Sequence, residues 1–294
     1  VKEMTRRALL PWLNAYRFLK TYTRIDAWSP SPSPQASPNI MDQWILSRLE
    51  SLKTNITREM EAYRLYNVVP ALFDFIEDLT NWYIRLNRGR FWDEALTDDK
   101  RHAFQTLYTA VHEFTVCMAP FAPFLSETLF KALPKQANSP ESVHLCQYPQ
   151  PESSRIAPAL EEAVSRMQNI ILLGRQKRNQ DRVKTKYPLK NLIILHQDPA
   201  LLTEISRLEP YIQSELNVKA VAYETNESDY ISLFARPNSP ILGKRLGGRF
   251  KNFKQAIDQL DSSELTELQD QGAITIEDET FSVEDILIFR EAKP

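Results

Sequence analysis

Apolar residues recur at intervals of three and four along most of the first 133 residues of this chain. That spacing places them on one face of a helix, and each such face must be buried against another element. Five segments with short links therefore predict an all-helical bundle. The predicted helices are Lys2 to Thr23, Asn39 to Tyr63, Asn67 to Asn87, one from near Thr97 to Met118, and one from Pro120 to Leu133.

Local signals predict where several of these helices begin and end. Asn39 and Asn67 are of the type that caps a helix N-terminus, and Pro70 would then fall in a first turn, where its missing N–H is tolerated. Gly89 predicts a stop or a kink. The segment from Trp28 to Pro38 holds four prolines among serines, which predicts an extended connector more strongly than a proline-rich ligand.

The second half of the chain changes class. Composition shifts at Pro134 to Ser154, so the predicted organisation is a helical-bundle domain at 1–140, a linker at 141–154 and an α+β domain at 155–294. The fold class is α+β, with a small and mainly antiparallel sheet in the second domain. The elements predicted there are a helix along Leu160 to Gly174, strands at 191–196, 218–224, 230–235, 273–276 and 286–289, and helices at 199–216 and 260–269.

The net charge of −2 conceals segregation along the chain. Residues 175–190 carry a net charge of +6 and residues 244–254 carry +5, whereas residues 258–291 hold eleven acidic side chains and one basic one. Such asymmetry can place a basic face beside RNA although the whole chain is slightly acidic. The alternative is a solvated surface with unevenly distributed charge.

One stretch of the third helix combines cations with aromatic residues. Successive residues lie 100° apart on a helix, so Asn81, Arg85 and Arg88 share the side opposite the apolar face, with Trp92 in line if the helix continues. Guanidinium groups bind phosphates and stack on bases, and an aromatic ring adds a stacking surface, which suits single-stranded RNA or a loop. Solvated arginines and a core tryptophan are the alternative interpretation.

Several function classes lack support in the sequence. No stretch approaches the roughly 20 apolar residues of a membrane span, and two cysteines, Cys117 and Cys146, cannot form a four-thiolate zinc site. Phosphate-loop, zinc-helix and nucleophile-elbow motifs are missing, and the four histidines are scattered. We therefore expect a soluble, cytoplasmic chain that performs no catalysis by itself. Its start at Val1, in mid-pattern, indicates a piece of a longer polypeptide.

Motifs in both halves resemble class I aminoacyl-tRNA synthetases for branched aliphatic amino acids, above all the isoleucyl-tRNA synthetase family. In the bundle these are Asp42-Gln43-Trp44-Ile45-Leu46-Ser47-Arg48-Leu49, Asn81-Trp82-Tyr83-Ile84-Arg85 with Arg90-Phe91-Trp92, and Met118-Ala119-Pro120-Phe121-Ala122-Pro123-Phe124-Leu125. In the second half they are Leu173-Gly174-Arg175, Val183-Lys184-Thr185-Lys186-Tyr187-Pro188-Leu189 and Leu242-Gly243-Lys244-Arg245-Leu246-Gly247. Gly89 departs from the family, which usually has arginine there.

The resemblance implies that the chain is the tRNA-binding, C-terminal part of an isoleucyl-type enzyme, without its catalytic and editing domains. It implies binding to the anticodon stem-loop of an isoleucine tRNA, with ATP and magnesium bound elsewhere on the full enzyme, no cofactor in this part and a monomeric whole protein. The residues expected to contact tRNA are Asn81, Arg85, Arg88, Arg90, Phe91, Trp92, Arg175, Lys184, Lys186, Lys244, Arg245 and Arg249.

Other functions stay open at this stage. The same region of a valyl or leucyl enzyme shares parts of these motifs. A helical protein-interaction scaffold would show an exposed apolar patch, and an unrecognised catalytic domain would show a cleft of carboxylates or histidines with shifted pKa values.

Overall fold

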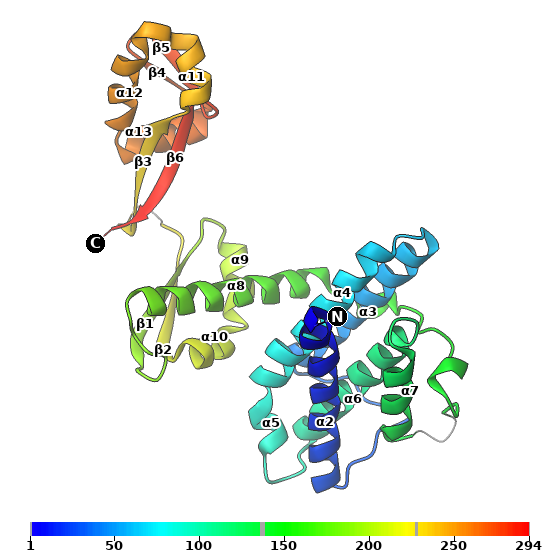
Figure 1. Cartoon of the computed structure of the whole chain (residues 1–294). Coiled ribbons are helices and arrows are strands. Elements are labelled where there is room, and N and C mark those ends of the chain that lie inside the picture. The colour runs from blue at the N-terminus through cyan, green and yellow to red at the C-terminus, as the bar shows by residue number, and fades with distance from the viewer. Residues whose placement is uncertain (1, 136–138, 227–228, 294) are drawn as a thin grey trace. The chain divides into compact units, whose positions relative to one another are not determined.

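The computed structural model describes residues 2–135, 139–226 and 229–293, and the chain divides into two compact units, Val1–Lys177 and Arg178–Pro294 (Figure 1). The first unit is helical, as predicted. Its elements are α1 (Lys2–Met4), η1 (Thr5–Leu9), α2 (Leu10–Ile25), α3 (Ile40–Glu61), α4 (Leu65–Glu77), η2 (Asp78–Ile84), α5 (Arg88–Trp92), α6 (Asp98–Met118), α7 (Pro123–Ala132), η3 (Val143–Leu145), η4 (Ser153–Arg155) and most of α8 (Pro158–Gln180).

Large aromatic side chains fill the centre of the bundle. Trp12, Trp44 and Phe75 are each at most 2% exposed. The ring of Phe114 lies edge-on to Trp12, with centroids 5.7 Å apart, and stacks on Phe75 at 5.4 Å. Burying each such side chain stabilises the fold by about 1.5 to 3 kcal/mol, so this core fixes the helices that carry the outer surface.

The predicted helix ends are partly confirmed. Asn39 caps α3, and its side chain accepts hydrogen bonds from the backbone N–H groups of Met41 and Asp42. The predicted cap at Asn67 is wrong, because α4 already begins at Leu65 and the amide of Asn67 instead donates to Glu59, at 2.8 Å. The hydrogen bond to Glu59 uses the side chain of Asn67, which therefore does not cap the helix.

The predicted stop or kink at Gly89 is displaced by two residues. The helix ends two residues earlier at Asn87, whose backbone has φ −102° and ψ 8°, and Gly89 lies inside α5. Asn87 is buried, and its side chain donates to the carbonyl of Tyr83 at 2.8 Å. That hydrogen bond gives the backbone an alternative to another helical turn. The chain therefore changes direction just before Arg88.

In its described residues, the second unit mixes helices with three two-stranded sheets. The pairs β3–β6 and β4–β5 are antiparallel, and β1–β2 is parallel because two helices connect its strands. The α+β class with a mainly antiparallel sheet is thus confirmed, although α11, α12 and β5 were not predicted. The elements are β1 (Leu189–Leu195), α9 (Pro199–Ser206), α10 (Glu209–Leu216), β2 (Val218–Glu224), β3 (Ile231–Pro237), α11 (Ser239–Leu246), η6 (Gly247–Arg249), α12 (Phe250–Asp258), α13 (Ser262–Gln271), β4 (Ala273–Ile276), β5 (Glu279–Ser282) and β6 (Ile286–Ala292).

Residues 141–154, the predicted linker, lie against the bundle. Val143 is buried in an apolar cluster with Val116 and Phe130. The backbone N–H of Glu152 donates to the buried carboxylate of Glu50, at 2.6 Å. This segment leads directly into α8, so its attachment fixes where α8 begins on the first unit.

Candidate nucleic-acid interface

Four residues on the segment from η2 to α5 point away from the core. Asn81, Arg85, Arg88 and Trp92, hereafter the outer row, are all exposed, whereas Tyr83 between them is fully buried. Asn81 lies on the π-helical η2, Arg85 directly follows it, and Arg88 and Trp92 lie on α5, after the break at Asn87. η2 is a turn of π-helix, a form that often marks functional sites. The row is therefore presented to solvent as the sequence predicts.

Trp92 is an exposed ring in a fixed orientation. It is 56% exposed, and its indole N–H donates to the hydroxyl of Tyr22 on α2, at 2.7 Å. A tryptophan whose polar atom is already bonded leaves its faces available for stacking.

Arg175 of α8 joins the outer row from a distant part of the sequence. Burial and the positive charge of nearby Arg85 together lower the pKa of Arg175. The guanidinium of Arg175 stays charged, because arginine is not deprotonated in proteins. Positive charge near it favours the approach of an anion such as a phosphate.

Polar contacts along α3 hold α8 against the bundle. The carboxylate of Glu161 accepts hydrogen bonds from Ser47 at 2.5 Å, Ser51 at 2.7 Å and Arg48 at 3.1 Å. Arg48 also donates to Asp78 at 2.9 Å, at the start of η2. Arg48 thereby links α8 to the segment that carries the outer row. This link could not be predicted from the sequence, because its members lie 30 and 113 positions apart.

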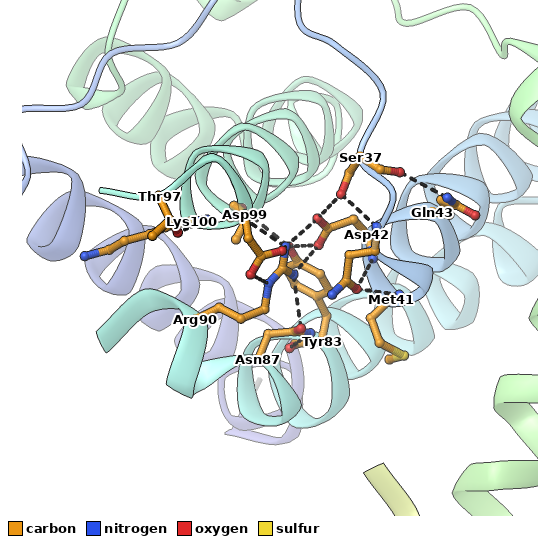
Figure 2. A network of polar contacts seen from close by, with 12 residues as sticks. Ser37, Met41, Asp42, Gln43, Tyr83, Asn87, Arg90, Thr97, Asp99 and Lys100 are labelled. Atoms are coloured by element: carbon orange, nitrogen blue, oxygen red, sulfur yellow. Dashed lines mark hydrogen bonds and ion pairs between the residues drawn. The ribbon is translucent and has the colours of Figure 1, made fainter. Parts of the chain in front are cut away.

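Arg90 lies in a buried polar network (Figure 2). Its guanidinium donates to both oxygens of Asp42, at 2.8 and 2.9 Å, and to Asp99 at 2.7 Å. Asp42 is fully buried and also accepts from the hydroxyl of Tyr83 at 2.7 Å. Burial alone disfavours the charged guanidinium, but the hydrogen bonds to Asp42 and Asp99 outweigh it and raise the pKa of Arg90 above its ordinary value.

Arg90 and Phe91 therefore differ from the other residues predicted to contact tRNA. The side chain of Arg90 is 14% exposed and its donors are taken up by carboxylates. Phe91 is fully buried, with its ring edge-on to Phe18 at 5.1 Å and tilted against Phe104 at 5.6 Å. Neither is available on the surface in this conformation. The hydrogen bonds of Arg90 and the ring contacts of Phe91 hold α5 against the bundle, and this orients Arg88 and Trp92.

In the second unit, Lys184 and Lys186 are exposed in the loop between α8 and β1. Lys186 lies over the ring of Tyr187, 5.3 Å from its centroid. Arg178, part of the same basic run, is instead 4% exposed and donates to the carbonyls of Tyr187 at 3.1 Å and Leu216 at 2.6 Å. It fastens the loop that presents the two lysines, a role the sequence did not reveal.

The two arginines of the second predicted basic run are neutralised by carboxylates, whereas its lysines are not paired with any carboxylate that the structure describes. Arg245 pairs with Asp285 at 2.8 Å, and Arg249 pairs with Asp278 at 2.5 Å and Glu279 at 3.2 Å. The acidic C-terminal segment thus folds against these arginines. Lys244 is exposed and forms no ion pair with the residues that the structure describes.

Other kinds of site receive little support. No group of three or more His, Cys, Asp or Glu among the described residues is arranged to hold a metal ion. Within the same residues, no helix has the length and apolar character needed to cross a bilayer. His112 stacks on Tyr108, and burial lowers its pKa.

A helical bundle that exposes arginines and a fixed tryptophan has surface chemistry suited to binding a nucleic acid. Residues 42–193 match the family described as the anticodon-binding domain of tRNA ligase. This match covers half of the chain, and the chain belongs to that family.

The whole chain is also similar to proteins named isoleucine–tRNA ligase. It is 42% identical to the one from Bdellovibrio bacteriovorus over all 294 residues, which are 28% of that protein. It is 39% identical to the cytoplasmic enzyme of Mus musculus, where 97% of the chain aligns with 24% of the relative. The cytoplasmic enzyme of Saccharomyces cerevisiae is 38% identical, with 94% and 27% covered. The chain spans about a quarter of the length of these relatives.

Proposed function

We propose that this chain is the tRNA-binding part of an isoleucine–tRNA ligase and that its helical unit binds the anticodon stem-loop of an isoleucine tRNA. The observation that carries the proposal is the set of exposed arginines with the fixed ring of Trp92, on a domain of the anticodon-binding family. The similarity to isoleucine–tRNA ligases along nearly the whole chain favours isoleucine over valine or leucine.

Each residue of the surface has a chemical role in this proposal. Arg85, Arg88 and Arg175 bind phosphates of the loop, because guanidinium groups donate two hydrogen bonds to an anion at once. Trp92 stacks on an unpaired base, and the amide of Asn81 donates to and accepts from a base edge. The exposed cations Lys184, Lys186 and Lys244 extend the positive potential without selecting a base.

The rest of the proposal concerns the longer protein. Attachment of isoleucine, with ATP and magnesium, takes place on residues outside this chain. Binding of the anticodon far from that site positions the acceptor end, so remote binding free energy contributes to the reaction. We propose a cytoplasmic, monomeric enzyme, by analogy with the cytoplasmic relatives for the location only.

The test is a titration of the chain with the anticodon stem-loop of an isoleucine tRNA and with that of another amino acid, at several salt concentrations. We expect tighter binding of the first and a linear fall of log K with log salt. Arg85→Ala and Arg88→Ala should each weaken binding by about 1 to 3 kcal/mol. Arg101→Ala removes an exposed arginine of the same unit outside the outer row, and should change little. Equal binding of both stem-loops would refute the proposal.

A further inference from the structure

The antiparallel strands β3 and β6 form a ribbon with two different faces. Side chains alternate between the faces of a strand. Ala235 and Ile286 point to the inner face and are buried in the core of this region. Phe234 and its cross-strand partner Phe289 belong to the opposite face, as does Leu287. Phe289 is 40% and Leu287 is 44% exposed, so this outer face presents apolar area to solvent.

The outer face is an aromatic platform with a cation on it. The rings of Phe234 and Phe289 stack with centroids 5.3 Å apart and planes 15° from parallel. The guanidinium carbon of Arg236 lies 6.0 Å from the first centroid and 5.7 Å from the second. Aromatic rings and a guanidinium plane are the surfaces on which unpaired nucleobases stack.

A pocket of about 470 Å³ adjoins this platform at the edge of β3. Phe234 and Arg236 line it from the strand, and Lys254 and Asp258 line it from α12. Lys254 is exposed and has no ion pair among the described residues. The pocket therefore combines a ring with two cations against one carboxylate, and its size is in the range of small-ligand sites.

We propose that this outer face, defined by Phe234, Arg236, Lys254 and Phe289, binds an unpaired nucleotide of single-stranded RNA. The base stacks on the aromatic pair, and Arg236 and Lys254 bind its phosphate. An extended peptide would also fit beside an edge strand, but two stacked rings with a guanidinium beside them are a surface suited to a nucleobase. The site lies within the second unit and outside residues 42–193, so it does not depend on anticodon binding by the bundle.

The experiment uses a ten-nucleotide single-stranded RNA with 2-aminopurine at its centre, whose fluorescence falls when the base stacks. It is titrated into the 294-residue chain carrying Arg85→Ala, Arg88→Ala and Trp92→Leu, so that the arginines and the ring of the outer row do not contribute. We expect quenching in this background. Phe289→Leu should abolish the quenching and weaken binding about 5- to 100-fold, whereas Phe289→Tyr, which keeps the ring, should retain both.

Matched variants control for charge and exposure. Lys254→Gln should reduce the slope of log K against log salt by the amount expected for the loss of one phosphate contact. Lys251→Gln is the same change on the same helix outside the pocket, and it should leave the slope unchanged. Phe124→Leu removes a ring that is 89% exposed in the other unit, and should have no effect. The proposed site would be refuted if the fluorescence is not quenched, or if Phe289→Leu quenches it as much as the background chain does. The preference of the unmodified chain for the isoleucine stem-loop is measured in a separate titration. The proposal of anticodon binding and the proposal of a nucleotide site on β3 and β6 can therefore each be refuted without the other.

Discussion

Arg90→Ala should destabilise the first unit strongly, because it leaves the carboxylate of Asp42 buried without its cation. Arg90 makes two hydrogen bonds to Asp42, which is fully buried, and the contact to Asp99 adds little because that side chain is 52% exposed. Removing one partner of a buried pair costs about 3 to 5 kcal/mol. Tyr83 and Ser37 still donate to Asp42, so we expect a value near 3 kcal/mol.

Urea unfolding followed by tryptophan fluorescence measures this loss. All five tryptophans lie in the first unit, so the signal reports that unit alone. With slopes of about 1 to 3 kcal/mol per molar urea, the midpoint should fall by roughly 1 M or more. Arg88→Ala, two positions earlier and exposed, is the control and should stay within about 0.5 kcal/mol.

A second pair of variants separates the ion pair from lost packing. Asp42→Asn keeps an acceptor for the hydroxyl groups of Tyr83 and Ser37, and Arg90→Met keeps much of the side-chain volume. Combined, they should destabilise the unit by at least about 1 kcal/mol less than the sum of the single changes, because no charge is left unpaired. Additive losses, or a cost of Arg90→Ala below about 1 kcal/mol, would refute this interpretation of the network.

Three further predictions concern local features. Tyr63 has φ 56° and is 92% exposed, so Tyr63→Gly should raise the urea midpoint by relieving about 1 kcal/mol of backbone strain, and an unchanged midpoint would contradict this. Hydrogen bonds from Arg64, Asn67 and Arg58 lower the pKa of Glu59 to about 2, below its unfolded value near 4.3. Its stabilisation should therefore be present above pH 4.3 and lost toward pH 2, and a pH series of unfolding should show a smaller loss in Glu59→Gln. Arg178→Ala should expose the loop after α8, so limited trypsin digestion should cut at Lys184 and Lys186 faster than in the unmodified chain.

The sequence could predict the helices but not which arginines remain on the surface. Apolar periodicity is a local property, and it placed Asn81, Arg85 and Arg88 on the exposed side correctly. Arg90 carries the same charge in the same motif, yet its partner Asp42 lies 48 positions away. Only the tertiary structure brings that carboxylate to it, so the surface and the buried arginine were indistinguishable beforehand.

The runs of basic residues also led to a wrong expectation of surface charge. Residues 244–254 look uniformly basic along the sequence, but Arg245 and Arg249 face carboxylates that lie 29 to 40 positions later. Two helices near them were not predicted, because Gly243, Gly247 and Gly248 read as a turn. Gly247, with φ 53°, does end α11, and η6 connects it to α12.

The basic surface of the first unit depends on a helix that sequence composition assigned to the other domain. Arg175 lies on α8, beyond the proline-rich segment at 134–154, yet the compact unit extends to Lys177 and the family match extends to residue 193. The physical reason is the acceptor supplied by Glu161. Without Glu161, the hydrogen bonds to Ser47, Ser51 and Arg48 would be lost. These hydrogen bonds fix the position of α8 along α3. Composition marks where a chain is extended, whereas paired polar groups determine which helix packs on the bundle, and here they hold α8, which carries Arg175, against α3.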